Sequence, residues 1–248
     1  MIQHQIKLQN WNITCANIEE ARRITESLYE DKEYACNLET DSPNILDVGS
    51  HIGLAILYFK RRYPNAKIIG FEPNPNTFNF LKKNIQQNSI SDINLINAGI
   101  ASQNGESDFF IDANPQNPWA WGDSMVQMPW YDKDKYQTIK VKTVRLSEYI
   151  NQKIDLLKID AEGYESEILS EIIDKLHLVK YIAVEFHGSK NNSKNNFKHL
   201  VNLLKNHNFK VMTKIKTILL PSFLTMPIYN IRSKLSDNYQ FLFHAKQV

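Results

Sequence analysis

Acidic and histidine side chains gather where two apolar runs end in the second half of the chain. Asp160 closes the run over residues 154–160, and Glu185 and His187 close the run over 181–187. Side chains alternate along a strand, so Glu185 and His187 share a face, and they converge with Asp160 if the two runs form neighbouring strands. Such a group could take a proton from a bound molecule, with His187 as the base or Asp160 in its place.

A mixed set of aspartate, glutamate and histidine could also hold a divalent cation that acidifies a hydroxyl group. We expect no metal, because nothing in the sequence shows that these side chains meet at one point. A structural interpretation is open as well: Glu185 and His187 could pair with each other or with Lys158 and stabilise the strand ends. Glu165 has the simplest interpretation, a solvated acid in the first turn of a helix.

Gly49 and Gly53 lie four residues apart, directly after the apolar run over 44–48. A tight loop at the carboxyl end of a parallel strand lets backbone N–H groups and the next helix meet a ligand. A dinucleotide fingerprint also needs glycine where His51 and Leu54 stand, and this loop lacks the Gly-Lys-Ser/Thr ending of a P-loop. The loop therefore disfavours NAD, FAD, ATP and GTP, and it favours S-adenosylmethionine (SAM), which has no pyrophosphate.

The next apolar run, over 67–72, ends in Glu72, 19 residues after Gly53. An acid at that place in a nucleoside-binding α/β fold accepts hydrogen bonds from both ribose hydroxyls. Ser50, His51 and Ile52 would offer backbone N–H groups to the carboxylate of SAM. The residues expected to bind this cofactor lie at or just after the ends of four apolar runs: Asp47, Gly49, Ser50, His51, Gly53, Glu72, Asn97, Ala98 and Asp160.

Four motifs, DVGSHIG, FEPNP, LLKIDAEGYESEIL and AVEFHG, follow one another between residues 44 and 190. Together they resemble the FkbM family of SAM-dependent methyltransferases. The resemblance implies the class I methyltransferase fold, a Rossmann-like seven-stranded, mainly parallel sheet with helices on both faces and an antiparallel last strand. It also implies methyl transfer to a hydroxyl group of a small molecule, sugar or glycan. N-methylation of a peptide or amide side chain and a catalytically silent SAM-binding module stay open as alternatives.

Short β-rich runs alternate with helical patterns, which predicts an α/β fold. Strands are expected at 44–48, 67–72, 93–97, 154–160, 181–187, 209–215 and 239–245. Helices are expected at 17–32, from 54 until Pro64, and at 75–88, 164–176 and 195–206. We expect an N-terminal helical segment over 1–43, then a methyltransferase domain over 44–248 with insertions at about 99–144 and 216–238.

Both insertions carry apolar residues whose role the sequence leaves open. The first has strand-like runs at 106–111 and 138–144 around three tryptophans, Trp119, Trp121 and Trp130. Their rings could stack on a sugar or aromatic acceptor, or they could cover the core. In the second, residues 216–231 could form a lid over the acceptor, a peptide groove or a flap on the core.

The composition sets the remaining limits. Among 248 residues, 29 Lys and Arg balance 27 Asp and Glu and form no extended basic run, so nucleic acid is not an expected partner. Cys15 and Cys36 lack metal-ligand or CxxC spacing, and free thiols fit a reducing cytoplasm. No apolar run approaches the roughly 20 residues of a spanning helix. We therefore expect a cytoplasmic protein without a membrane span; its oligomeric state is not indicated.

Overall fold

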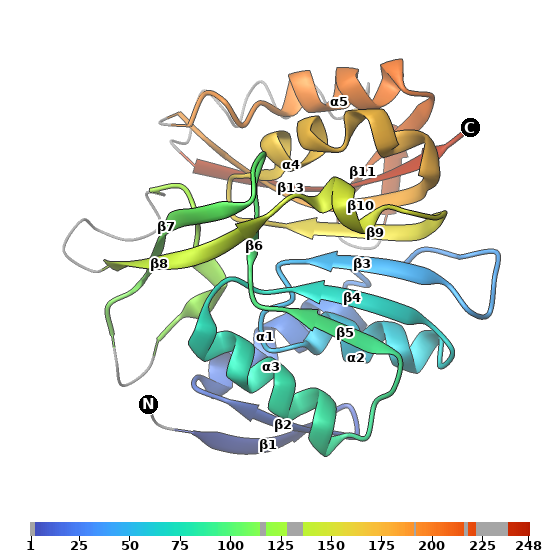
Figure 1. The fold of residues 1–248 in the computed structure, drawn as a ribbon. Helices are drawn as coiled ribbons and strands as arrows, with labels where there is room; N and C mark the ends of the chain where they lie inside the picture. The colour runs from blue at the N-terminus through green and yellow to red at the C-terminus, as the bar shows by residue number, and fades with distance from the viewer. Residues whose placement is uncertain (1–2, 115–117, 128–135, 191, 216–217, 222–237) are drawn as a thin grey trace.

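Figure 1 shows the computed structural model of the protein, an α/β fold built on one large sheet. The structure describes residues 3–114, 118–127, 136–190, 192–215, 218–221 and 238–248. The strand order in the main sheet is β12-β11-β13-β10-β9-β3-β4-β5. The strands are β3 Asn44–Val48, β4 Lys67–Phe71, β5 Ile93–Ile96, β9 Ile154–Asp160, β10 Val179–Ser189, β11 Phe209–Ile215, β12 Ile218–Pro221 and β13 Asn238–Gln247.

The sheet confirms the seven predicted strands. The pairs β3–β4, β4–β5, β3–β9 and β9–β10 are parallel, as crossover helices require. The last strand, β13, runs antiparallel between β10 and β11. One short strand was not expected: β12 pairs with β11 and extends the edge of the sheet.

The sheet is buried on both faces, which explains why its strands are apolar along their whole length. Leu46 and Val48 of β3 point into a core shared with α4 and α5, whereas Ile45, directly before Leu46, points into a core shared with α1, α2 and α3. The helices are α1 Ile18–Tyr29, α2 Leu54–Arg62, α3 Pro75–Gln87, α4 Glu165–Glu171 and α5 Phe197–Asn206. Helices therefore cover both faces (Figure 1), as predicted.

Asparagine side chains cap three of these helices. Asn17, Asn74 and Asn196 accept backbone N–H groups at the starts of α1, α3 and α5. The helix expected at 164–176 ends earlier, since α4 stops at Glu171 and the 3-10 helix η3 follows over Ile173–Leu178. An apolar residue at every third or fourth position fits either kind of helix, so the pattern could not separate the two.

The first described residues form a hairpin, which the sequence pattern did not reveal. Strands β1 His4–Leu8 and β2 Trp11–Cys15 pair antiparallel around Gln9 and Asn10, both with positive φ. The hairpin contacts α3, where Asn84 Oδ1 accepts the N–H of Thr14 at 2.7 Å. The helix predicted at 17–32 is confirmed as α1.

A smaller sheet lies between β5 and β9 in the sequence. Its strands are β6 Gly99–Ile100, β7 Gly105–Asp112 and β8 Tyr136–Val144, in the order β6-β8-β7, with the 3-10 helices η1 Ala120–Gly122 and η2 Leu146–Tyr149. Both strand-like runs of this segment are thus confirmed. Cys15 and Cys36 are free thiols, as expected. In the described parts of the chain, every helix is too short or too polar to cross a bilayer.

Candidate active site

A cavity of about 1120 Å³ lies where β3, β4, β9 and β10 end. Carboxyl ends of parallel strands are the usual ligand site of open α/β sheets. Four chain segments at these ends line the cavity: residues 48–51, 71–73, 160–162 and the pair Glu185 and His187. Residues of α1 and η1 also line it. The cavity therefore joins the predicted cofactor loop to the predicted catalytic side chains.

Gly49 is the point where the glycine loop touches β9. Its φ is +75°, and a Cβ atom on it would lie 1.8 Å from the main-chain oxygen of Asp160. Only glycine combines that backbone angle with so close a contact. Gly53 has a φ of +91° at the start of α2, where a Cβ would meet Leu81 at 2.7 Å. Gly53 shapes the loop and is not among the described residues that line the cavity.

Glu72 is buried at the end of β4 and lines the cavity. One carboxylate oxygen accepts the N–H of His51 at 2.9 Å, and the other accepts the N–H of Asn74 at 2.8 Å. Burial raises the pKa of Glu72 to about 7, although both N–H groups favour its anion. Glu72 thus links the glycine loop to the start of α3 and keeps further lone pairs for a ligand.

The backbone N–H groups of Ser50 and His51 donate to other parts of the protein, and not to a cofactor carboxylate as the sequence predicts. The N–H of Ser50 donates to the carbonyl of Phe71 at 2.9 Å, and that of His51 donates to Glu72. The fold of the loop engages both donors, so neither is available to the carboxylate of a cofactor. Ser50 and His51 still line the cavity, and a role in cofactor binding rests on their other atoms.

Three further predicted cofactor residues lie in different places. Ala98 lines the cavity. Asn97 donates from Nδ2 to the carbonyl oxygens of Glu72 and Pro73, at 2.8 and 3.1 Å, and so fixes the turn after β4. Asp47 is fully buried, with Oδ1 3.3 Å from Nζ of Lys158. Neither Asn97 nor Asp47 is among the described residues of the cavity wall.

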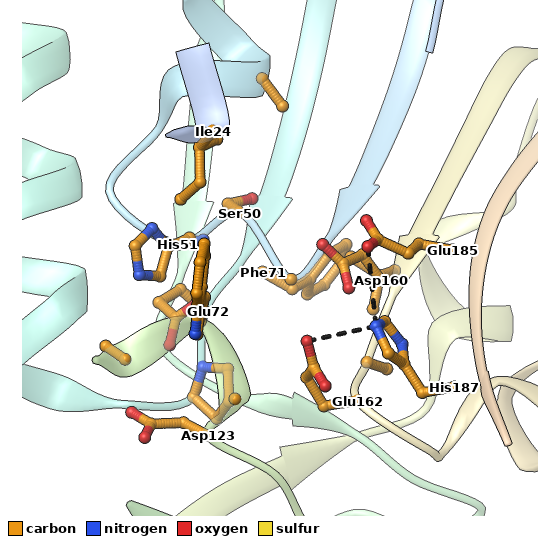
Figure 2. Close-up of a pocket in the computed structure, with 18 of the residues that line it drawn as sticks. Ile24, Ser50, His51, Phe71, Glu72, Asp123, Asp160, Glu162, Glu185 and His187 are labelled. Atoms are coloured by element: carbon orange, nitrogen blue, oxygen red, sulfur yellow. Dashed lines mark hydrogen bonds and ion pairs between the residues drawn. The ribbon is translucent and has the colours of Figure 1, made fainter. Parts of the chain in front are cut away.

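The predicted convergence of Asp160, Glu185 and His187 is confirmed. Strands β9 and β10 are neighbours, and Glu185 pairs in register with Asp160. Figure 2 shows these side chains facing the side of the cavity that holds His51 and Glu72. Glu162, in the turn after β9, joins them with Oε1 3.4 Å from Nε2 of His187. The same nitrogen lies 3.6 Å from Oε1 of Glu185.

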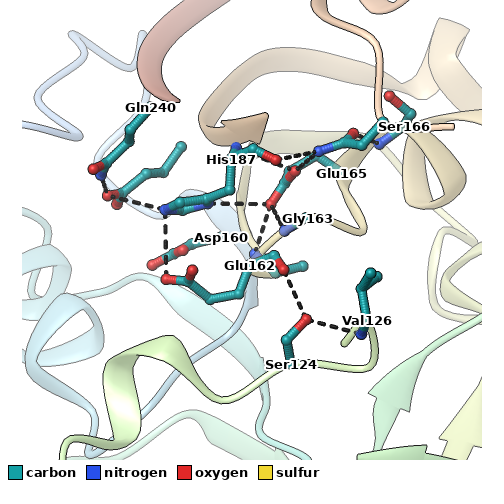
Figure 3. A network of polar contacts seen from close by, with 12 residues as sticks. Ser124, Val126, Asp160, Glu162, Gly163, Glu165, Ser166, His187 and Gln240 are labelled. Atoms are coloured by element: carbon teal, nitrogen blue, oxygen red, sulfur yellow. Dashed lines mark hydrogen bonds and ion pairs between the residues drawn. The ribbon is translucent and has the colours of Figure 1, made fainter. Parts of the chain in front are cut away.

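Glu165 fixes the other side of the His187 ring (Figure 3). Its Oε1 lies 3.3 Å from Nδ1 of His187 and accepts the N–H of Gly163 at 2.9 Å. Its Oε2 accepts a hydrogen bond from Nδ2 of Asn195. The expectation of a solvated first-turn acid is wrong, because Glu165 is 0% exposed. It orients His187 so that Nε2 faces Glu162 and Glu185.

Burial and neighbouring charges shift the pKa values of Asp160 and His187 to different extents. Burial alone would lower the pKa of His187, but the carboxylates of Glu162, Glu165 and Glu185 outweigh burial and hold it well above its ordinary value. Burial, with the neighbouring charge of Glu185, raises the pKa of Asp160 to about 7. Near neutral pH, His187 therefore carries a proton, whereas Asp160 is poised to accept one.

A buried ammonium group supports Asp160. Nζ of Lys158 lies 3.5 Å from Oδ2 of Asp160 and donates to the carbonyl of Gly49 at 2.6 Å. The other carboxylate oxygen of Asp160, Oδ1, is buried and has no hydrogen-bond partner among the described residues. An unpaired buried acceptor is costly, so a donor from a ligand would be stabilised there.

Asp160, Glu162 and His187 could also hold a cation. Each offers one ligand atom, and the three atoms lie within 4.8 Å of one another. One histidine nitrogen and two carboxylate oxygens suit several divalent metals. The expectation that the protein uses no metal stays a prediction.

The sequence pattern did not reveal Tyr34, which lines the cavity, or Glu20, which contacts two residues of its wall, His51 and Trp121. Tyr34, buried in the segment after α1, donates from its hydroxyl to Glu185. Glu20 of α1 accepts the N–H of Trp121 at 2.8 Å, and its Oε2 lies 3.6 Å from Nε2 of His51. Burial lowers the pKa of His51 to about 3 and raises that of Glu20 to about 8, so both are neutral at pH 7.

The tryptophan-rich segment reaches the cavity in part. Trp119 and Trp121 line it, and the guanidinium of Arg23 lies 5.5 and 5.9 Å from their ring centres. Trp130 and residues 216–217 and 222–231 of the expected flap lie outside the described residues. Whether these rings contact an acceptor stays a prediction.

Fold and cavity together define a class I, SAM-dependent methyltransferase: the last strand along the chain is inserted antiparallel into a mainly parallel sheet, and a glycine loop and a buried acid face a proton-accepting cluster. The comparison with protein families agrees, because the model of the methyltransferase FkbM domain matches residues 47–211. The chain belongs to the FkbM methyltransferase family.

Two curated methyltransferases are similar to this chain over most of their length. Methyltransferase 1 of Beauveria bassiana is 28% identical over 187 residues, 69% of this chain and 75% of the relative. The 2-O-methyltransferase NoeI of Sinorhizobium fredii is 26% identical over 176 residues, 66% of this chain and 72% of the relative. The crystal structure of an FkbM methyltransferase from Methylobacillus flagellatus superposes with a TM-score of 0.55 at 13% identity, over 89% of this chain but 47% of the other. That likeness supports the fold.

Proposed function

We propose that the protein transfers the methyl group of SAM to a hydroxyl oxygen of a small molecule or sugar. One observation carries this proposal. Oδ1 of Asp160, buried and without a donor among the described residues, belongs to the residue whose main-chain oxygen contacts Gly49 of the cofactor loop. A hydroxyl group bound there would donate a hydrogen bond to Oδ1, beside the cofactor loop.

The cofactor half of the cavity fits SAM. When bound, SAM supplies an electrophilic methyl group on its sulfonium. Glu72 would accept hydrogen bonds from the ribose hydroxyls with the lone pairs that His51 and Asn74 leave free. Gly49 lets the cofactor loop lie directly against the main chain of β9, because its position tolerates no side chain. Ala98 offers a small apolar wall next to Glu72.

The acceptor half can activate an alcohol, which is a poor nucleophile until it loses its proton. Asp160 takes that proton as general base, in a site where the ammonium of Lys158 steadies its Oδ2. His187, protonated and held by Glu165, lies on the acceptor side as a hydrogen-bond donor. General-base catalysis of this kind raises the rate about 100- to 10,000-fold, and alignment of the hydroxyl oxygen with the methyl group supplies the remaining acceleration.

The name of one relative, 2-O-methyltransferase NoeI, supports oxygen as the acceptor atom. Trp119 and Trp121, which line the cavity, are side chains on which sugar rings stack. N-methylation of a peptide or amide side chain is the outcome that would oppose this proposal.

The experiment is a transfer assay with CD3-labelled SAM and a metabolite and glycan extract of the source organism. Mass spectrometry locates the label in each product. The proposal expects a labelled methyl ether that the Asp160→Asn variant does not form. A label on nitrogen, or equal labelling by the variant, would reject it.

A further inference from the structure

Tyr34 lies in the segment between α1 and β3 and reaches the end of the sheet. Its side chain is 4% exposed and lines the cavity. The family match begins at residue 47, so Tyr34 comes from a part of the chain outside it. Asp160 and Glu185, 126 and 151 residues further along the chain, are its polar partners.

The Tyr34 hydroxyl sits between two carboxylates. It donates to Oε2 of Glu185 at 2.8 Å, and it lies 3.5 Å from Oδ2 of Asp160. A hydroxyl has one proton, and the shorter contact marks Glu185 as the main acceptor. Nζ of Lys158, 5.4 Å from the centre of the Tyr34 ring, reaches the same Oδ2 of Asp160. Tyr34 and Lys158 therefore both contact the Asp160 oxygen that is not left for the acceptor.

Glu185 links Tyr34 to His187. Its Oε1 accepts a hydrogen bond from Gln240 of β13 and lies 3.6 Å from Nε2 of His187. Glu33, next to Tyr34, also lines the cavity, so a further carboxyl group besides those of Asp160, Glu162 and Glu185 faces the site. Like charges in register on β9 and β10 repel each other, and a buried hydroxyl donor between them offsets that repulsion.

We propose that Tyr34 is a positioning residue for methyl transfer, whose hydroxyl holds the carboxylates of Asp160 and Glu185 in place beside His187. The inference rests on the proposed function, because it concerns the base of that reaction. Tyr34 acts through these carboxylates: its donated hydrogen bond fixes Glu185, and its position beside Oδ2 leaves Oδ1 of Asp160 toward the acceptor.

The test compares Tyr34→Phe with a matched control, Tyr63→Phe. Tyr63 is also buried, and its hydroxyl donates at 2.8 Å to the carbonyl of Cys36 in the same N-terminal segment. It is not among the described residues that line the cavity. Both variants lose one buried hydroxyl and keep the ring, so a general loss of stability would affect them alike.

The readouts are the initial rate of label transfer from methyl-labelled SAM into the extract fraction that the wild type labels, its pH profile, and the Kd of SAM by calorimetry. In Tyr34→Phe we expect the rate to fall about tenfold or more, as for a lost hydrogen bond to a charged group. The rising limb of the pH profile should move to higher pH, because the carboxylates lose a donor that favours their anions. The Kd of SAM should stay within about twofold.

Tyr63→Phe should keep the wild-type rate and pH profile. An unchanged rate and profile in Tyr34→Phe, or equal losses in both variants, would overturn the inference. The proposed function fails differently: the wild type itself would then place no label on oxygen.

Discussion

Oε1 of Glu165 lies 3.3 Å from Nδ1 of His187, and the same oxygen accepts the N–H of Gly163 in the turn that carries Glu162. One buried carboxylate therefore holds both the imidazole and the turn after β9. Glu165 therefore acts on the acceptor side through His187 and the turn after β9, although it is not itself among the described residues of the cavity wall.

Glu165→Gln keeps the shape of this residue but removes its charge. We expect the rate of methyl transfer to fall about 100-fold, because a misoriented or neutral imidazole loses most of the benefit of a placed acid–base group. The Kd of SAM should change by less than about twofold, since the side chain of Glu165 bonds to Gly163, His187 and Asn195 and is not among the described residues of the cavity wall. Transfer assays and calorimetry measure the two effects.

The matched control for this change is Glu171→Gln in the same helix. Glu171 accepts hydrogen bonds from Nε of Arg145 and from the N–H of Ser147, both at 3.0 Å, and is not among the described residues of the cavity wall. Its variant should lose stability and keep its rate per folded molecule. Equal loss of rate in the two variants would show that Glu165 acts through stability alone.

Gly49→Ala should destroy the cofactor loop. The new methyl group would lie 1.8 Å from a main-chain oxygen of β9, at a φ of +75° that alone costs about 1–2 kcal/mol. We expect a loss of several kcal/mol of unfolding free energy in urea and no SAM binding by calorimetry. Gly105→Ala is the control, because its Cβ would meet Thr143 at an ordinary 3.9 Å. A Gly49→Ala protein of wild-type stability that binds SAM would contradict the loop geometry.

Glu72 should make the ligand-free protein less stable as pH rises. Its pKa is raised from 4.5 to about 7, so the native state keeps a proton that the unfolded chain releases. That contribution is full below pH 4.5 and is lost as pH rises through about 7, a change of about 3 kcal/mol. In Glu72→Gln, the difference in unfolding free energy between pH 5 and pH 8 should shrink by about this amount. Urea titrations at both pH values test it, and an unchanged difference would count against a raised pKa.

Removal of metal should leave methyl transfer intact. Cationic groups of the chain already face the acidic cluster, with Nζ of Lys158 3.5 Å from Asp160 and the His187 ring 3.4 Å from Glu162. After EDTA treatment and dialysis, we expect the rate to stay within about twofold. A loss that Mg²⁺ or Mn²⁺ restores would instead make Asp160, Glu162 and His187 a metal centre.

Sequence patterns within single strands and loops were enough to predict much of this site. The meeting of Asp160 with Glu185 and His187 could be predicted, because polar residues that end neighbouring parallel strands share an edge of the sheet. Gly49 and Glu72 followed from loop and strand spacing in the same way.

Contacts between distant segments could not be predicted. Glu165 has the local pattern of an exposed first-turn acid, and it is buried because Asn195 and His187, from two other elements, close over it. Tyr34 belongs to a segment without helix or strand. No periodic pattern in the sequence predicts where such a segment lies relative to the sheet. The hairpin before α1 was missed because its turn, Gln9 and Asn10, lacks the glycine of the common signal.

The central claim is that one cavity holds a cofactor half at Glu72 and a separate acceptor half at His187. Calorimetric titration of SAM into the wild type, Glu72→Ala and His187→Asn tests it most directly. We predict one SAM site in the wild type, binding at least about tenfold weaker in Glu72→Ala, and binding within about twofold of the wild type in His187→Asn. A wild type that binds neither SAM nor S-adenosylhomocysteine, or equal loss of affinity in both variants, would contradict it.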